Sequence, residues 1–269
     1  MTLARRLLLL PLLACAASLV LSACGTPTTA APAGAAPRTA MDQSDAEKRA
    51  NVRIELAAGY FSRGQYSTAL DEVKQALLLR PGMREAVNLR GLIYGAMGER
   101  ALAEESFKNA LALYPNDADT LHNYGWMLCQ GRRFPEATQQ FELALAQNSY
   151  RAPARTYLAK GVCEAQAKDY GTAEKTLLRA FEFDPGNPAV AYNLADVLYK
   201  NGQYERALFY IKRVNTQAEQ SNAQSLWLAL RIQRRMKDSV AVSDLGRQLR
   251  QRFSDAPETQ ALNAERFDD

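Results

Sequence analysis

An alanine recurs at nearly constant spacing along most of the chain, and this period restricts the fold more than any other feature. Six such alanines follow one another at 34 residues, with one step of 36: Ala69, Ala103, Ala137, Ala173, Ala207 and Ala241. A small residue stands twelve positions before each of them: Ala57, Gly91, Gly125, Gly161, Ala195 and Ala229. Two helix backbones cross closely only where side chains are small, so each period predicts one antiparallel helix pair.

The length of the period resembles that of tetratricopeptide repeats (TPRs). The resemblance implies an all-α solenoid of about six helix-turn-helix repeats that forms a right-handed superhelix. Prolines at Pro81, Pro115 and Pro185 close three of the repeats, because proline cannot continue a helix. We expect six repeats over residues 45–255 and a capping helix or tail over 256–269. The expected pairs are Ala50–Met83, Arg84–Asp117, Ala118–Arg151, Ala154–Asn187, Pro188–Ser221 and Asn222–Asp255.

The first residues have the layout of an export signal. Two arginines are followed by an apolar stretch that is too short for a comfortable bilayer-spanning helix, which needs roughly 20 apolar residues. This stretch ends in "LSAC" at Leu21–Cys24, which resembles the lipobox of bacterial lipoproteins. The resemblance implies a cleaved signal peptide over residues 1–23 and an acylated Cys24. The alternative is an ordinary signal peptide that happens to contain a cysteine.

The residues after Cys24 indicate an address and a tether. Gly25 is not the aspartate that commonly retains such lipoproteins at the inner membrane, so the resemblance implies the outer membrane, with the protein facing the periplasm. Residues 24–44 consist mainly of Ala, Pro, Thr and Gly, which cannot bury enough surface to offset the entropy of ordering. We expect this segment to be a disordered tether.

Charge and motifs argue against several classes of function. Without residues 1–23 the chain would carry 31 basic and 29 acidic side chains, so no electrostatic footprint for nucleic acid is expected. The sequence contains no phosphate-binding loop, dinucleotide fingerprint or nucleophile elbow. Its single histidine, His122, has no neighbouring cluster of metal ligands. We therefore expect a monomeric binding protein without enzymatic activity, cofactor or metal.

Two cysteines remain after Cys15 is removed with the signal and Cys24 is acylated. Cys129 and Cys163 occupy positions 12 and 10 of the first helices of repeats three and four, so they lie at about the same height on adjacent helices. In an oxidising compartment this placement favours a disulfide that joins the two repeats. Two buried free thiols are the alternative.

In TPR proteins the first helices line a concave groove, and a set of repeat positions points into it. The side chains at those positions are largely apolar and aromatic, and the Lys/Asn/Arg clamp that binds C-terminal carboxylates in TPR co-chaperones is missing. An apolar helix or strand of a partner therefore suits the groove, although packing between repeats would explain any single member equally well. The candidate groove residues are Ile54, Phe61, Asn88, Leu92, His122, Trp126, Leu158, Tyr192 and Tyr199.

Three segments, together with the lipobox and tether, resemble one family over essentially the whole chain: "HNYGWMLC" (122–129), "FPEATQQFELAL" (134–145) and "NLADVLYKNGQYERAL" (193–208). The family is that of the type IV pilus biogenesis/stability lipoproteins, PilW/PilF. The resemblance implies a pilotin, which is an outer-membrane lipoprotein that binds secretin subunits and promotes their localisation and multimerisation. The alternative is a lipid-anchored periplasmic TPR scaffold for envelope or cell-wall enzymes.

Overall fold

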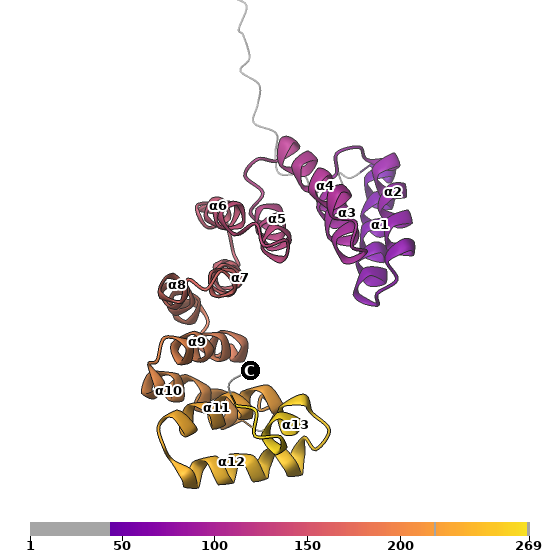
Figure 1. Cartoon of the computed structure of the whole chain (residues 1–269). Coiled ribbons are helices and arrows are strands. Elements are labelled where there is room, and N and C mark those ends of the chain that lie inside the picture. The colour runs from indigo at the N-terminus through magenta and orange to yellow at the C-terminus, as the bar shows by residue number, and fades with distance from the viewer. Residues whose placement is uncertain (1–43, 218, 268–269) are drawn as a thin grey trace, which may run out of the picture. The chain divides into compact units, whose positions relative to one another are not determined.

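The computed structural model describes residues 44–217 and 219–267, and these belong to one compact unit built from helices (Figure 1). The expected signal peptide, Cys24 and the tether up to residue 43 lie outside the described residues. Within them the chain forms helices and no strand, which confirms the expected all-α repeat fold. The helices are α1 (Asp45–Ser62), α2 (Tyr66–Leu79), α3 (Arg84–Ala96), α4 (Arg100–Leu113), α5 (Ala118–Gln130), α6 (Phe134–Leu145), α7 (Pro153–Gln166), α8 (Tyr170–Phe183), α9 (Pro188–Lys200), α10 (Tyr204–Asn215), α11 (Ala223–Arg235), α12 (Ser239–Arg252) and α13 (Pro257–Asn263).

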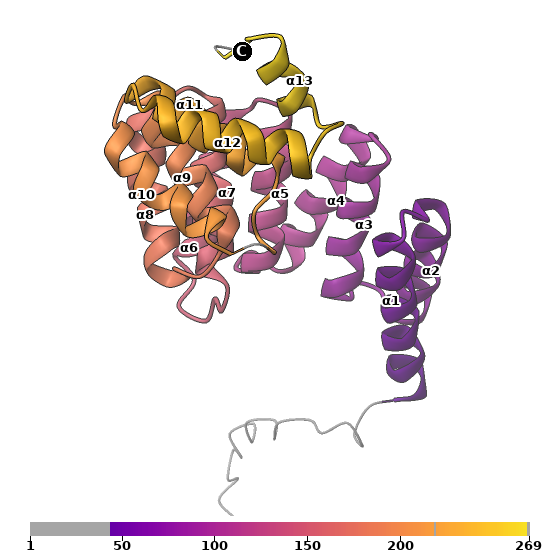
Figure 2. The ribbon, with the colours of Figure 1, turned by 90° about the horizontal axis from the view of Figure 1, so that it is seen from below.

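The helices associate as six antiparallel pairs, from α1/α2 to α11/α12, and each pair contacts the next one (Figures 1 and 2). The backbones of the first helices α1, α3, α5, α7, α9 and α11 lie close to one another in succession, whereas those of the second helices in the described part lie farther apart. Second helices of neighbouring pairs can still touch through long side chains, as Phe181 of α8 does with Tyr210 of α10 at 5.1 Å between ring centroids. We call the side formed by the first helices the inner face. No helix among the described residues combines the length and the apolar character needed to cross a membrane.

The first helix begins five residues earlier than the repeat pattern predicts, at Asp45 instead of Ala50. A capping box explains the difference. The hydroxyl of Ser44 accepts a hydrogen bond from the backbone N–H of Glu47 (3.2 Å), and the Glu47 carboxylate accepts one from the backbone N–H of Ser44 (2.9 Å). These bonds satisfy amide groups that the helix itself leaves unpaired.

The small residues of the period allow close crossing within each pair. A Cβ added at Gly91 would lie 2.6 Å from the ring of Phe107, and one added at Gly125 would lie 2.9 Å from the ring of Phe141. In both pairs the large side chain that faces the glycine stands four positions after the repeated alanine. In the first pair the crossing residue is Ala57, and the residue that corresponds to Phe107 is the smaller Val73, which lies in the same cluster of buried side chains. A smaller side chain on one helix thus compensates for a larger one on the other.

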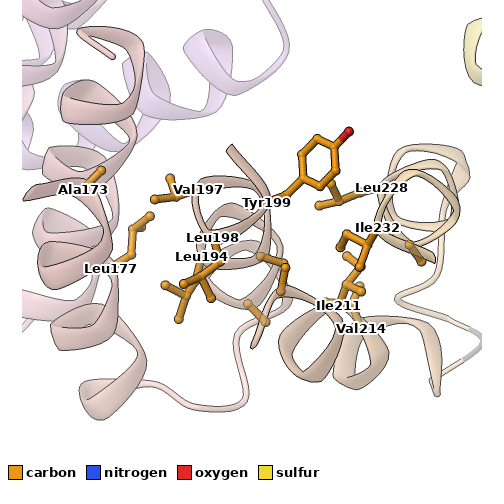
Figure 3. Close-up of a cluster of buried hydrophobic side chains, with 14 residues drawn as sticks. Ala173, Leu177, Leu194, Val197, Leu198, Tyr199, Ile211, Val214, Leu228 and Ile232 are labelled. Atoms are coloured by element: carbon orange, nitrogen blue, oxygen red, sulfur yellow. The ribbon is translucent and has the colours of Figure 1, made fainter. Parts of the chain in front are cut away.

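The largest buried cluster spans repeats four to six (Figure 3). Leu194 and Leu198 of α9 are fully buried among side chains from α8, α10 and α11, of which Leu177 and Ile211 are also fully buried. Each such side chain contributes about 1.5–3 kcal/mol through removal of apolar surface from water. The array is therefore held together by contacts between neighbouring pairs as well as within them.

The turn inside each pair contains one residue with left-handed backbone. This residue is Gly64 in the first pair (φ 73°) and Lys237 in the last pair (φ 63°). Glycine adopts this conformation without steric cost, whereas a residue with a Cβ does so at a penalty. Not every turn in the array therefore has the residue type that its backbone favours.

The last pair is covered by α13. Leu262 of this short helix is buried against Leu226, Leu230 and Leu249 of α11 and α12. Phe267 stacks on Trp227 with ring centroids 5.6 Å apart. The C-terminal end of the array therefore presents little of its apolar interior to solvent.

Candidate functional site

The candidate groove residues all lie on first helices, but they do not share one environment. Ile54, Phe61, Asn88, Leu92, Trp126, Leu158 and Tyr192 are half-buried, whereas His122 and Tyr199 are only 7% and 8% exposed. The inner face is thus a series of local environments, and each candidate residue has to be considered with its own neighbours.

Three of the candidates come together in one recess of the inner face. Phe61 of α1, Leu92 of α3 and Trp126 of α5 line a cavity of about 260 Å³, which we call the inner recess. Asn123 also lines it and donates a side-chain hydrogen bond to Asn88 (3.1 Å). The remaining lining residues are Gly91, Gly95, Ala96, Phe107, Met127 and Gln130. The recess is therefore apolar, uncharged and bordered by amide groups.

His122 is a packing residue. Its Nδ1 lies 2.8 Å from the hydroxyl of Thr156, which in turn lies 2.6 Å from the hydroxyl of Tyr150. Desolvation and, to a smaller extent, the positive charge of Arg155 lower the pKa of His122 to about 3. A buried, neutral imidazole that joins repeats three and four is not presented to a partner.

Tyr199 also belongs to the contacts between repeats. The guanidinium of Arg231 on α11 lies 4.9 Å from the centroid of its ring, and Tyr204 packs against it at 5.7 Å. Leu158 and Tyr192 pack against the same buried cluster as Tyr199. The half of the inner face formed by α7, α9 and α11 is consequently committed to packing at these positions.

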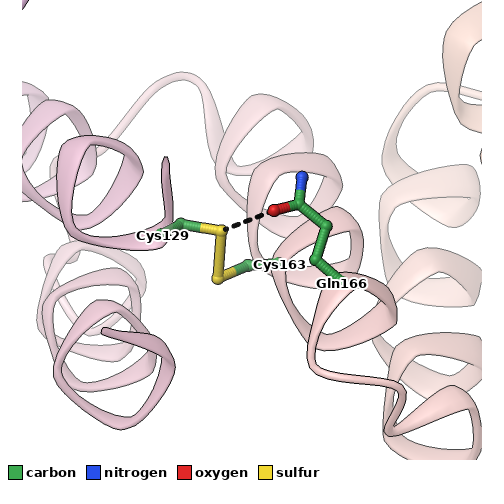
Figure 4. The surroundings of a disulfide bond; sticks show 3 residues. All are labelled: Cys129, Cys163 and Gln166. Atoms are coloured by element: carbon green, nitrogen blue, oxygen red, sulfur yellow. Dashed lines mark hydrogen bonds between the residues drawn. A yellow bond between two sulfur atoms is a disulfide. The ribbon is translucent and has the colours of Figure 1, made fainter. Parts of the chain in front are cut away.

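The two cysteines that the sequence places at the same height form a disulfide between α5 and α7 (Figure 4). Their Cα atoms are 5.7 Å apart, and both residues are buried. The Gln166 Oε1 lies 3.9 Å from the Cys129 sulfur, a polar contact without a hydrogen bond because a disulfide sulfur carries no proton. The bond links the third and fourth repeats covalently.

A second surface was missed by the analysis of the sequence. Val52 and Leu56 of α1 and Leu78 of α2 are 54%, 43% and 75% exposed. They line a cavity of about 630 Å³ on the first helix pair, together with Lys48, Arg49, Arg53, Gln75 and Leu79. We call this surface the N-terminal face. A signal was present in the sequence, because the three consecutive leucines of "ALLLR" (76–80) are more than one side of a helix can bury.

The charged side chains that line the N-terminal face are all basic. Its lining contains three basic residues and no acidic one. Arg53 is paired with Glu72 (2.8 Å), while Lys48 and Arg49 extend from the exposed side of α1. An apolar segment that also carries acidic side chains would complement this surface.

The ion pairs around Glu104 have a structural role. Glu104 of α4 accepts hydrogen bonds from Arg133 (2.6 Å) and Tyr124 (3.0 Å), and Lys108 lies 2.8 Å away. The hydrogen bonds from Arg133 and Lys108 lower the pKa of Glu104 to about 2. The same carboxylate and the burial of Tyr124, which is the larger cause, raise the pKa of that phenol to about 12. Both groups thus keep one charge state at neutral pH, and no set of three potential metal ligands lies together in the described chain.

The match to known families covers most of the helical unit. Profiles described as "Tetratricopeptide repeat" match residues 54–118, 89–152 and 130–188, and a further one matches residues 164–230. The type IV pilus assembly protein PilF of Pseudomonas aeruginosa is 29% identical over 213 residues, which are 79% of this chain and 84% of PilF.

Solved structures agree with this relationship. The crystal structure of PilW, described as a widely conserved type IV pilus biogenesis factor, is 30% identical and superposes with a TM-score of 0.74, covering 80% of this chain and 98% of PilW. The chain belongs to the PilF/PilW family of TPR proteins of type IV pilus biogenesis. The structure of Pseudomonas aeruginosa PilF superposes with a TM-score of 0.72 at 27% identity, covering 83% of this chain and all of that one. This PilF/PilW-family chain also shares its fold alone with MamA, at 18% identity and a TM-score of 0.51.

Proposed function

We propose that this PilF/PilW-family protein is a pilotin: an outer-membrane lipoprotein, facing the periplasm, that binds secretin subunits and promotes their multimerisation during type IV pilus biogenesis. The single observation that carries the binding role is the N-terminal face. Three exposed apolar side chains lie together there on one helix pair. A cluster of this kind indicates an interaction surface, whereas single exposed apolar residues do not. Membership of the pilus biogenesis family indicates the machinery to which the partner belongs.

The position of this face in the chain suits such a role. Cys24, the proposed site of acylation, lies about 20 residues before α1 in the sequence. A tether of that length, if flexible as its composition predicts, would have a root-mean-square span of roughly 25 Å. A secretin subunit bound to the first helix pair would therefore be held close to the membrane. Gathering several subunits there raises their effective concentration without any further chemistry, and the role requires no catalytic group.

The proposal is tested by gene deletion and by charge substitutions. Deletion is expected to abolish heat- and detergent-resistant secretin multimers in outer-membrane fractions while the secretin monomer persists, and surface pili should be lost in parallel. Leu56→Asp together with Leu78→Asp should reproduce this loss, since two carboxylates oppose burial of an apolar segment.

A matched control is available at the other end of the array. Val240 of α12 is as exposed as Leu78, at 71%, and it lies in the first turn of its helix, where a carboxylate is favourable. Val240→Asp should therefore leave the multimers unchanged. Normal multimers and pili in the deletion strain would reject the pilotin role and favour a periplasmic scaffold for other envelope proteins.

A further inference from the structure

At two junctions between neighbouring first helices, the side chain at position 12 of one repeat contacts the side chain at position 10 of the next. In repeats three and four this contact is the disulfide between Cys129 and Cys163. In repeats five and six the guanidinium of Arg231 lies against the ring of Tyr199. Both are direct side-chain contacts that close the inner face between two helices.

The equivalent position in the second repeat is Gly95, which lies 34 residues before Cys129. A glycine presents no side chain to Met127, the residue that corresponds to Cys163 on the next first helix. A Cβ added at Gly95 would meet nothing within 4 Å. The contact that closes the inner face at those two junctions is therefore absent between α3 and α5, and the inner recess opens at this point.

The space next to Gly95 has two connected parts. The inner recess of about 260 Å³ is lined by apolar side chains that include Phe61, Leu92 and Trp126. A second cavity of about 450 Å³ shares Gly95, Met127 and Gln130 with it and adds Arg100, Glu104 and Arg133. An apolar cavity of about 150 Å³ is enough for a benzene ring, so the inner recess has room for one large apolar side chain.

The second cavity carries an unbalanced positive charge. Arg133 is neutralised by its ion pairs with Glu104 and Glu136. Arg100 has no ion-pair partner among the described residues, and it stands at the first position of α4, where the helix dipole disfavours a cation. A carboxylate near Arg100 would be attracted both by the guanidinium and by the helix N-terminus.

We propose that the gap at Gly95 is a socket for a single leucine- or phenylalanine-sized side chain of the secretin, with an acidic residue beside it that pairs with Arg100. The inference rests on the proposed function, because it names the chemistry that the same partner presents to the inner face. It adds a second contact to the N-terminal face and assigns Gly95 a role in specificity: the missing side chain is what admits the partner.

Filling the socket tests the proposal. Gly95 lies in right-handed helix with open space around its Cα, so Gly95→Leu introduces a side chain without strain and improves helix propensity. The new leucine would occupy the socket and exclude the partner. Cells that carry this variant should form at least about tenfold fewer heat-resistant secretin multimers at a normal level of the protein, because burial of the anchor side chain is lost.

Two further variants make the result specific. Gly171 of α8 is also an exposed helical glycine whose added Cβ would meet nothing, so Gly171→Leu should leave the multimers unchanged. Arg100→Gln removes the cation from the start of α4, where the helix dipole disfavours it, and adds no carboxylate beside Glu99 and Glu104, so a loss of multimers in this variant would not come from instability. Arg100→Lys should restore them in large part.

The outcomes separate the two proposals. Loss of multimers in Gly95→Leu with normal multimers in Gly171→Leu supports the socket. Wild-type multimers in Gly95→Leu overturn it, and the pilotin role still stands if deletion or the Leu56/Leu78 double variant abolishes them. If deletion has no effect on multimers, the proposed function fails and the socket falls with it. Should Gly95→Leu reduce the protein level, Trp126→Ala, which removes one wall of the socket, decides in its place.

Discussion

The two ends of the helical array treat their apolar surfaces in opposite ways. At the C-terminal end, α13 covers the last pair, with Leu262 packed on Leu226, Leu230 and Leu249. At the N-terminal end, α1 and α2 leave Val52, Leu56 and Leu78 open to solvent. A terminal repeat normally needs a polar outer side or a cap, because no further repeat follows to bury it.

The fold itself does not require an open end. The same chain supplies a short capping helix at one end, and α1 is extended at the other end by a capping box that satisfies its backbone without covering its apolar side chains. The uncovered face of α1 and α2 is the surface that we propose for the partner, whereas the covered end contributes stability.

The largest difference in unfolding free energy is expected between a charge placed at the covered end and one placed at the open end. Leu262→Asp should lower the free energy of unfolding by about 4 kcal/mol, because it removes a buried leucine and buries an unpaired carboxylate. Leu78→Asp should change it by less than about 0.5 kcal/mol, because that side chain is already exposed. Urea denaturation followed by circular dichroism measures both values, and equal effects would contradict the comparison.

Removal of the disulfide should affect the interior more than either end. Cys129 and Cys163 are separated by 34 residues, and a cross-link of that length stabilises by about 3–4 kcal/mol in the chain-entropy model. The double Cys→Ala variant should show faster amide hydrogen exchange from α5 to α8, since each repeat contacts only its neighbours. Exchange in α1 and α2 should stay at the wild-type rate, and acceleration there of the same size would show that the array unfolds as one unit.

Mild acid should likewise lower the stability of the middle repeats, where His122 lies. The pKa of His122 lies near 3 in the folded protein and near 6.5 in the unfolded chain, so below pH 6.5 the unfolded state binds more protons. Its contribution to stability is complete above pH 6.5 and is lost as the pH falls, by about 1.4 kcal/mol per pH unit. His122→Gln should flatten the unfolding free energy between pH 6.5 and 5, where no other side chain of the chain has its ordinary pKa. An unchanged slope would show that the imidazole is solvated.

The smallest effect separates the two terminal turns. Lys237 holds a left-handed backbone in the last pair, where the first pair has Gly64. Lys237→Gly should stabilise the protein by about 0.5–1 kcal/mol, and Gly64→Lys should destabilise it by a similar amount. Thermal unfolding followed at 222 nm would show the shifts as opposite changes in Tm, and changes of the same sign would refute the explanation based on backbone conformation.

Much of the candidate site could be predicted from the sequence, but the residues that line the recess could not be distinguished from those that are buried. The repeat spacing placed Phe61, Leu92 and Trp126 on one side of the array, where they do meet. The same spacing also selected His122 and Tyr199, which are buried because Thr156 and Arg231 happen to stand opposite them. Periodicity fixes the direction of a side chain, whereas its exposure depends on the size of a residue one repeat away.

The number and pairing of the helices follow from the sequence, because small residues at a period of 34 specify where backbones can cross and prolines specify where helices stop. It also brought Cys129 and Cys163 to the same height on adjacent helices. Which apolar surfaces stay open, namely the N-terminal face and the recess at Gly95, is set by how the helices pack. The leucines of "ALLLR" and Gly95 can be read in the sequence. Whether a neighbouring element covers the leucines or fills the space beside the glycine depends on residues far away in the chain, and within the described residues no element does so.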